Sequence, residues 1–218
     1  MFPKFRADWI HDAIVSNGGR EVLHDGAIGL PSQRRLASLQ EPLLPFDSSL
    51  ICISERPHRT FKWLMAVAAG VPLVHWRWLR ECIVNNKLVS YEPFLLKAGF
   101  SVTRNGMVPY VPSVPGAPLL FDGLKVEVYG STSWRDMWSC VLREQGAEVV
   151  ERLHVGNESS LDFVLSHESH EYPTDLVLTK AAQLNIPVVS KEWVIQCLLD
   201  RKLLKVSQEE EFFATRII

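Results

Sequence analysis

The strongest constraint on this chain is an internal repeat. The stretch "LVHWRWLRECIV" at 73–84 recurs as "VVSKEWVIQCLL" at 188–199, 115 positions later and without a gap. A chain of 218 residues with such a repeat is expected to fold as two related domains, because compact domains usually hold roughly 100–150 residues. The residues that recur at matched positions are Pro72, Trp78 and Cys82 in the first copy and Pro187, Trp193 and Cys197 in the second.

Composition argues against several classes of protein. No apolar run approaches the ~20 residues of a membrane helix, and the N-terminus does not resemble a secretory signal, so we expect an intracellular protein without a membrane partner. A net charge of −2 disfavours a protein that wraps DNA, so direct DNA binding is not expected and any anion site is local. The four cysteines, at 52, 82, 140 and 197, form no Cys-x-x-Cys pair and are interpreted as reduced core residues.

The matched segments predict the same order of elements in each copy. Residues 59–74 align with 174–189, and each segment is predicted to form a helix, a turn at Gly70 or Asn185, and a short strand. The helix that follows carries one buried stripe. We expect this stripe to comprise Trp78, Leu79, Cys82 and Ile83 in the first copy and Trp193, Val194, Cys197 and Leu198 in the second.

Further upstream, each copy holds another helix and more strands. Strands are predicted at 48–55, 124–131 and 161–167, and helices within 9–23 and 138–150, each helix stopped by glycine and followed by a strand. Because strands separated by helices must cross over, this order predicts a small α/β unit with a parallel sheet in each copy.

The domain boundaries follow from the proline and glycine content. The first unit is assigned to residues 1–104, with a surface insertion at 24–47, and the second to 121–218. Between them, residues 105–120 hold prolines at three-residue spacing, which predicts a stiff polyproline II linker.

The helix predicted to open at residue 59 has an unusual charge pattern. Arg56, His58, Arg59 and Lys62 crowd its first turn, although a helix N-terminus already carries a partial positive charge. The matched helix of the second copy has Glu171, Thr174 and Asp175 there. Because the rule is broken in one copy only, this position is a candidate anion site, and phosphate is the natural guest of such a helix start. A solvated basic patch is the alternative.

These patterns resemble the BRCT domain, the breast-cancer C-terminal module. Gly19 and Gly146 match its glycine after the first helix, and Trp78 and Trp193 its tryptophan in the last helix. The stretches "AAGVPLV", "YEPFLLKAGFS" and "IPVVSKEWVIQCL" are similar to the tandem BRCT region of DNA-damage checkpoint mediators, the subgroup of the vertebrate p53-binding protein one and its yeast counterparts.

This resemblance implies a four-stranded parallel sheet flanked by helices in each unit. It also implies a nuclear, non-catalytic scaffold without a cofactor, which binds phosphorylated proteins such as a phosphorylated histone tail, and other checkpoint proteins. Within "RTFKW", the resemblance assigns Thr60 and Lys62 to the phosphate and Arg59 to the peptide.

The same resemblance implies a peptide groove between the units. Leu64 and Trp134 are expected to line it, with the alternative that both are ordinary core residues. The family's phosphate pocket also uses a Ser or Thr and a glycine at the end of the first strand. The stretch "MFPKF" is too short for that strand, which predicts that the first unit is truncated and lacks its opening strand.

Other patterns are weaker. His167 and His170 lack a third metal ligand, so no metal site is expected, and Gly26 and Gly29 lack the setting of a nucleotide loop. Three alternatives to phosphopeptide binding stay open. The first is a phosphate-independent interaction surface formed by the linker and first unit, the second a doubly wound enzyme domain, and the third a nucleic-acid end binder.

Overall fold

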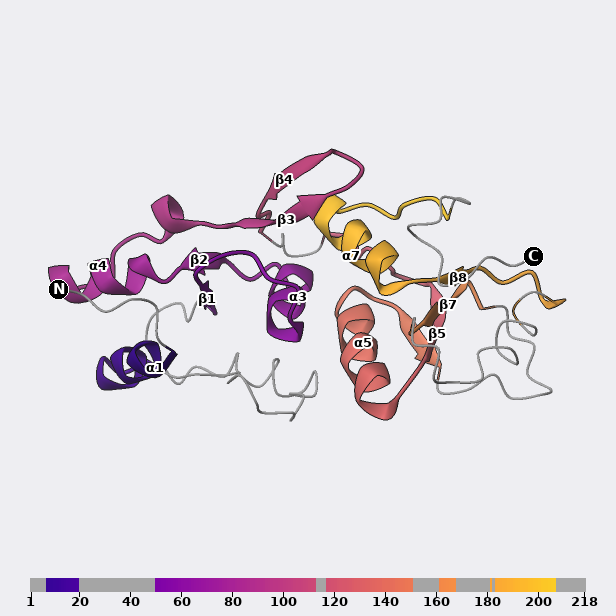
Figure 1. Cartoon of the computed structure of the whole chain (residues 1–218), viewed down its shortest axis with the longest axis horizontal. Helices are drawn as coiled ribbons and strands as arrows, with labels where there is room; N and C mark the ends of the chain where they lie inside the picture. Colours follow the sequence, from indigo (N-terminus) through magenta and orange to yellow (C-terminus); the bar gives the residue numbers. More distant parts are fainter. Residues whose placement is uncertain are drawn as a thin grey trace. The chain divides into compact units, whose positions relative to one another are not determined.

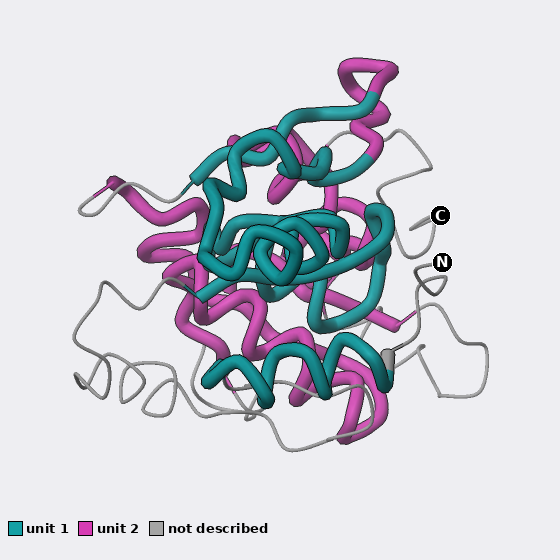
Figure 2. Tube along the Cα trace, turned by 90° about the vertical axis from the view of Figure 1, so that its left-hand side faces the viewer, with its two compact units in different colours: residues 1–99, 107–113 teal, residues 100–106, 114–218 magenta. Residues whose placement is uncertain are grey.

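The computed structural model describes residues 7–19, 50–112, 117–150, 161–167, 181 and 183–206. The chain divides into two compact units, coloured separately in Figure 2. Unit 1 comprises Met1–Gly99 with Met107–Ser113, and unit 2 comprises Phe100–Gly106 with Val114–Ile218. None of the helices in the described part of the chain is long and apolar enough to span a membrane. The predicted insertion at 24–47 lies outside the described residues.

The described residues of unit 1 form a pair of parallel strands, three α-helices and a hairpin stem (Figure 1). In chain order, its elements are α1 (Ala7–Ser16), β1 (Cys52–Ser54), α3 (Phe61–Ala68), β2 (Leu73–His75), α4 (Arg77–Asn85), the 3-10 helix η1 (Glu92–Phe94), β3 (Lys97–Ser101) and β4 (Gly106–Pro109). Strands β1 and β2 run parallel, with Cys52 beside Leu73 and Ser54 beside His75. The strand expected after α1 lies outside the described residues.

One hydrophobic cluster of unit 1 joins α1, β2 and α4. Its buried members are Ala13, Val74, Trp78, Leu79 and Cys82. The Trp78 indole also donates a hydrogen bond to the Val89 carbonyl at 2.8 Å, which fixes the chain after α4. Helix α4 therefore buries the stripe that its sequence predicts, with one exception.

The exception is Ile83, which is 40% exposed. The prediction that Ile83 belongs to the buried stripe is wrong. Ile83 lies about 40° around the helix axis from the buried Leu79 and about 100° from Cys82, so it is at the edge of the buried stripe, where its side chain stays partly exposed. Its counterpart Leu198 is 1% exposed, so identical spacing in the two copies leads to different burial.

Unit 2 is built on one four-stranded parallel sheet. Its elements are β5 (Lys125–Tyr129), α5 (Thr132–Glu144), β6 (Glu148–Val150), β7 (Phe163–Ser166), β8 (Val188–Val189) and α7 (Lys191–Asp200). The strand order is β6-β5-β7-β8. All three neighbouring pairs are parallel, as the alternation of strands and helices predicts. Helix α5 begins at Thr132, six residues before the segment predicted to contain it.

Aromatic rings fill the core of unit 2. Trp193 of α7 lies against Phe163 at 5.0 Å and Phe121 at 6.1 Å between ring centroids. Gly146 ends the turn after α5 with a φ of +91°, and an added Cβ there would meet the Asp122 Cα at 3.0 Å. Glycine is therefore required at this position for its backbone angle and for space. Gly70 and Asn185 also adopt positive φ, which confirms the predicted turns.

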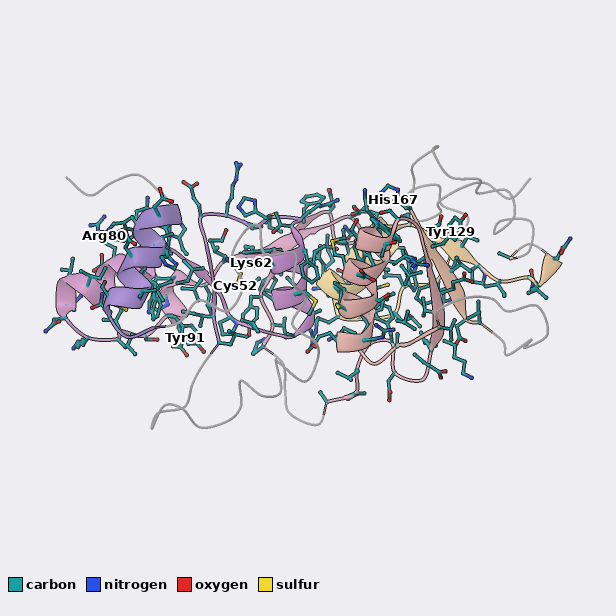
Figure 3. The ribbon with its side chains drawn as sticks, turned by 90° about the horizontal axis from the view of Figure 1, so that it is seen from below. Cys52, Lys62, Arg80, Tyr91, Tyr129 and His167 are labelled. Atoms are coloured by element: carbon teal, nitrogen blue, oxygen red, sulfur yellow. The ribbon has the colours of Figure 1, made fainter. Side chains whose placement is uncertain are left out.

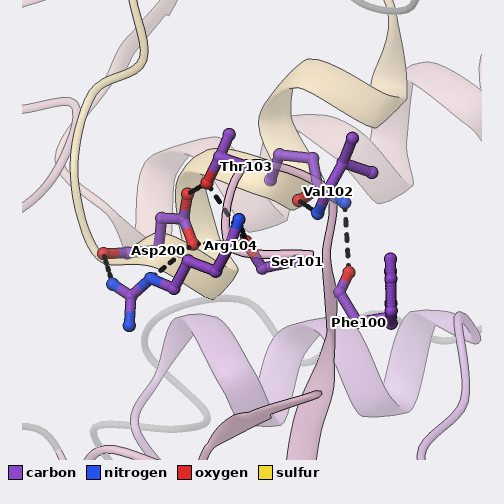
Figure 4. A network of polar contacts seen from close by, with 7 residues as sticks. Phe100, Ser101, Val102, Thr103, Arg104 and Asp200 are labelled. Atoms are coloured by element: carbon purple, nitrogen blue, oxygen red, sulfur yellow. Dashed lines mark hydrogen bonds and ion pairs between the residues drawn. The ribbon is translucent and has the colours of Figure 1, made fainter. Parts of the chain in front are cut away.

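The turn of the β3–β4 hairpin, residues 100–106, belongs to unit 2 and binds α7 (Figure 4). The Asp200 side chain, 0% exposed, lies 3.1 Å from the Arg104 Nε and accepts a hydrogen bond from the Ser101 hydroxyl at 2.7 Å and another from the Thr103 hydroxyl. The Gln196 side chain accepts from the Val102 N–H at 2.9 Å. This hydrogen-bonded contact between hairpin turn and α7 is called the α7 clasp below.

The hairpin changes the interpretation of the linker. Residues 106–109 form strand β4 rather than the start of a polyproline segment. A β-strand tolerates Pro109 at its last position because no further ladder hydrogen bond is required there. The domain boundaries proposed from the sequence, at 104 and 121, stay a prediction.

Candidate functional site

The candidate site lies on the segment that joins β1 to α3. The Trp76 N–H donates to the Ser54 carbonyl at 2.9 Å, which prolongs the parallel pairing to the last residue of β1. The Ser54 hydroxyl then donates to the Arg56 carbonyl at 2.9 Å and fixes the turn that leaves the strand. Residues 55–60 therefore start from the carboxyl edge of a parallel pair, the usual place for ligand-binding loops in α/β folds.

Helix α3 begins at Phe61, two residues later than the sequence predicts, with Thr60 as its N-cap. Thr60 has an extended backbone, with φ −76° and ψ 157°, and its hydroxyl makes no cap hydrogen bond. The first turn contains no acidic residue. Since the first N–H groups of a helix have no intrahelical acceptor, this start offers donors to an anion.

The three predicted contact residues lie at this helix start. Arg59 and Thr60 are exposed, and Lys62 (labelled in Figure 3) is half-buried on the first turn of α3. Behind them, the Trp63 indole donates to the Ala98 carbonyl at 2.8 Å, and the His58 ring meets the Trp63 ring edge-on at 6.3 Å between centroids. This buried tryptophan holds the helix start in place while the polar residues remain accessible.

Leu64 and Trp134 lie in different units. Leu64 is 4% exposed within α3 of unit 1. Trp134 is 9% exposed in the first turn of α5 in unit 2, where its ring meets His167 at 5.1 Å and Trp138 at 5.9 Å. Both side chains are thus buried, and the groove proposed from the family resemblance stays a prediction.

Two further basic residues at the same strand edge were not singled out from the sequence. His75 ends β2 directly beside Ser54, and Arg77 opens α4. Burial and then the Arg77 charge lower the pKa of His75, while Glu55 opposes them. The repeat contained a signal for Arg77, because the matched residue is the acidic Glu192.

The other candidate motifs contribute no site here. Among the described residues, no group of three His, Cys, Asp or Glu side chains is placed to hold a metal ion. His167 packs on Trp134, and His170 lies outside the described residues together with Gly26, Gly29 and the residues that match the basic helix start, Glu171, Thr174 and Asp175.

Comparison with protein families and curated proteins identifies relatives. The family of the BRCA1 C Terminus (BRCT) domain matches residues 119–215. The chain is 24% identical over 205 residues to the DNA repair protein crb2 of Schizosaccharomyces pombe, covering 86% of this chain and 26% of that protein. It is also 33% identical over 75 residues to the BREAST CANCER SUSCEPTIBILITY 1 homolog of Arabidopsis thaliana, covering 33% of this chain and 8% of that protein. The chain thus spans about a quarter of the length of crb2.

Two solved structures are among those similar to this chain. The BRCT3,4 region of Schizosaccharomyces pombe Rad4 has a TM-score of 0.39 and 19% identity, covering 94% of this chain and 89% of that one. The complex of Rtt107p with a phosphorylated histone has a TM-score of 0.49 and 10% identity, covering 75% of this chain and 76% of that one.

Proposed function

Because the BRCT family matches residues 119–215 and the chain is similar to crb2 over 86% of its length, we propose that it is a tandem BRCT region that acts as a non-catalytic scaffold module and binds phosphorylated proteins. The observation that carries the proposal is the start of α3. There, Arg59, Thr60 and Lys62 lie at a helix start that the Thr60 hydroxyl does not cap, and no acid occupies the first turn. An incoming phosphate would accept from the backbone N–H groups of this helix start and from the Lys62 ammonium, and Arg59 would contact the peptide.

The biological setting we propose is the DNA-damage checkpoint response in the nucleus. The similarity to a DNA repair protein over 86% of the chain supports this setting. The ligand we propose is a phosphorylated histone tail, which the resemblance to checkpoint mediators implies, with other checkpoint proteins as further partners.

The test is the affinity of the chain for a histone-tail peptide with and without phosphoserine, measured by fluorescence anisotropy. We expect at least about tenfold tighter binding of the phosphorylated peptide, because charge-assisted hydrogen bonds contribute more than neutral ones. Lys62→Glu should remove about 2 kcal/mol of that binding, roughly thirtyfold in affinity. Lys97→Glu is the control, since it makes the same charge change at an exposed residue of unit 1. Equal affinity for both peptides would contradict the proposal.

A second candidate function is a phosphate-independent interaction through the linker and first unit. Met107 and Val111, 47% and 46% exposed, favour it, because they place apolar side chains on the accessible part of this segment. This function predicts that Met107→Asp with Val111→Asp abolishes binding of the unphosphorylated peptide, whereas Lys62→Glu leaves that binding unchanged. Loss of binding with Lys62→Glu alone would exclude this alternative.

A further inference from the structure

The carboxyl end of α4 exposes an unusual number of apolar side chains. Ile83 is 40% exposed, Val84 58% and Leu88 82%. The opposite side of the helix is already packed, with Trp78, Leu79 and Cys82 buried in the core of unit 1. Val84 lies on the side of the helix opposite this stripe and Ile83 lies at the edge of the stripe, while Leu88 follows the end of α4 at Asn85. A surface helix of a globular domain normally places polar residues on its outer side.

In the second copy, two of these three positions are buried, and the third, Leu203, is 48% exposed. Leu198 and Leu199, which match Ile83 and Val84, are only 1% and 7% exposed. The residues of α7 from Trp193 to Asp200 are all buried. The same helix is thus covered in one copy and uncovered in the other. An apolar surface that the same fold buries elsewhere is a candidate for contact with a partner.

Charge identifies the kind of partner. Arg77 lies seven residues before Val84 and Arg80 four residues before it, so both lie on the same side of the helix as Val84. Lys87 is exposed between Val84 and Leu88. Glu81 is the acidic residue within α4, and its carboxylate lies 4.0 Å from the Arg80 guanidinium. Residues 77–88 therefore carry three cations and one carboxylate, and this excess of positive charge favours an acidic partner.

We propose that Ile83, Val84 and Leu88, bordered by Arg77 and Lys87, form a docking surface for an acidic amphipathic helix of a partner protein. Such a helix places apolar anchors at i, i+4 and i+7 against the exposed side chains, while its carboxylates pair with the bordering cations. The interaction needs no phosphate. This α4 surface uses none of the residues proposed to contact phosphate at α3, so each site can be removed while the other is tested.

The experiment uses the full chain and a fluorescein-labelled peptide of about 15 residues, with Leu at i, i+4 and i+7 and Glu at the positions that flank these leucines. Binding is followed by fluorescence anisotropy. We expect Leu88→Glu and Lys87→Glu each to weaken binding by about tenfold, because each substitution adds a negative charge where the acidic helix would bind. A peptide with Lys in place of every Glu should bind at least about tenfold more weakly than the acidic peptide.

The repeat supplies matched controls at the same positions of the second copy. Leu203→Glu and Lys202→Glu make identical changes at exposed residues of unit 2 and should leave the affinity unchanged. Equal binding of the acidic and basic peptides, or equal losses in the two sets of variants, would overturn the proposal. Two other results would also overturn it: concentration-dependent self-association that Leu88→Glu removes, which indicates a second copy as the occupant, and tighter binding to anionic lipid vesicles than to the peptide.

Discussion

Helices α4 and α7 occupy matched places in the repeat. They share a buried inner side, but they differ in what contacts their outer side. Both bury a tryptophan and a cysteine four residues apart, with Trp78 and Cys82 in α4 and Trp193 and Cys197 in α7. On the outer side, α7 binds the hairpin turn through a buried carboxylate, whereas α4 exposes Ile83 and Val84. The inner side follows from helix periodicity, while the outer side depends on what the rest of the chain places against it.

The residues that make the α7 clasp explain why α7 can be covered. Gln196 and Asp200 supply acceptors for a backbone N–H and for side-chain donors of the hairpin turn. The matched positions in α4 hold Glu81 and Asn85, and the Asn85 amide donates back to the Glu81 carbonyl at 2.8 Å. A helix whose polar groups bond to its own backbone offers fewer contacts to a neighbouring segment.

The largest effect is expected from removal of the core tryptophans. Trp193→Ala should destabilise the protein by about 4 kcal/mol, because Trp193 is 1% exposed and packs against two phenylalanine rings. Trp78→Ala should cost about 3 kcal/mol, since Trp78 is 8% exposed and is therefore less completely buried than Trp193. Urea unfolding followed by circular dichroism measures both. A greater loss for Trp78→Ala would contradict the view that α7 has the more completely packed core.

Removal of the buried carboxylate tests the difference between the outer sides. Asp200→Ala should cost about 3 kcal/mol, because Arg104 and the Ser101 and Thr103 hydroxyls lose a shared acceptor. Asn85→Ala, at the matched and exposed position of α4, should change the free energy of unfolding by less than about 0.5 kcal/mol. Urea unfolding gives both values, and hydrogen exchange of residues 100–106 should accelerate in the first variant only. Equal effects of the two substitutions would show that the α7 clasp adds no stability.

A smaller effect is expected at the helix starts. The Ser190 hydroxyl caps α7 by accepting from the Glu192 N–H at 3.2 Å, so Ser190→Ala should cost about 1 kcal/mol. Thr60 makes no such bond at α3, so Thr60→Ala should change stability by only about 0.3 kcal/mol. The same Thr60 variant should weaken phosphopeptide binding in the anisotropy assay. A stability loss with unchanged phosphopeptide affinity would assign Thr60 to the fold instead of the ligand.

The smallest effect concerns pH. Burial and Arg77 lower the pKa of His75 below its ordinary value of 6.5, and Glu55 opposes this shift. The lowered pKa means that His75 binds a proton less readily in the folded state than in the unfolded state. His75 should therefore leave the free energy of unfolding unchanged above pH 6.5 and lower it as the pH falls below 6.5. His75→Ser introduces the residue found at the matched position 190 and should flatten this dependence. Unfolding free energies measured across this range provide the check, and an unchanged slope in the variant would contradict the assignment.

Local sequence signals predicted the regular elements well. Strands β1, β2, β5, β7 and β8 and the turns at Gly70 and Asn185 lie where apolar runs and turn residues place them. The basic helix start was also found, because a charge that opposes the helix dipole is visible in the sequence. These features depend on residues within a few positions of one another, so a single sequence contains the information.

The features that escaped prediction all depend on residues distant in the chain. Strand β4 was assigned to a proline linker, because prolines at three-residue spacing are typical of polyproline II as well as of a strand end. His75 was not recognised as a neighbour of the candidate site, because its place beside Ser54 follows from the register of β1 and β2. Pairing register is a property of the sheet and is only weakly encoded by either strand alone.

The sequence by itself determined that there are two related units, which side of each final helix faces inward, and where a helix begins with excess positive charge. Helix periodicity and backbone stereochemistry act over a few residues, so these features are local. Only the tertiary structure decided that α7 is covered and α4 is not. Ser101 and Asp200 are 99 residues apart in the chain, and a buried carboxylate is stable only where folding brings such donors to it.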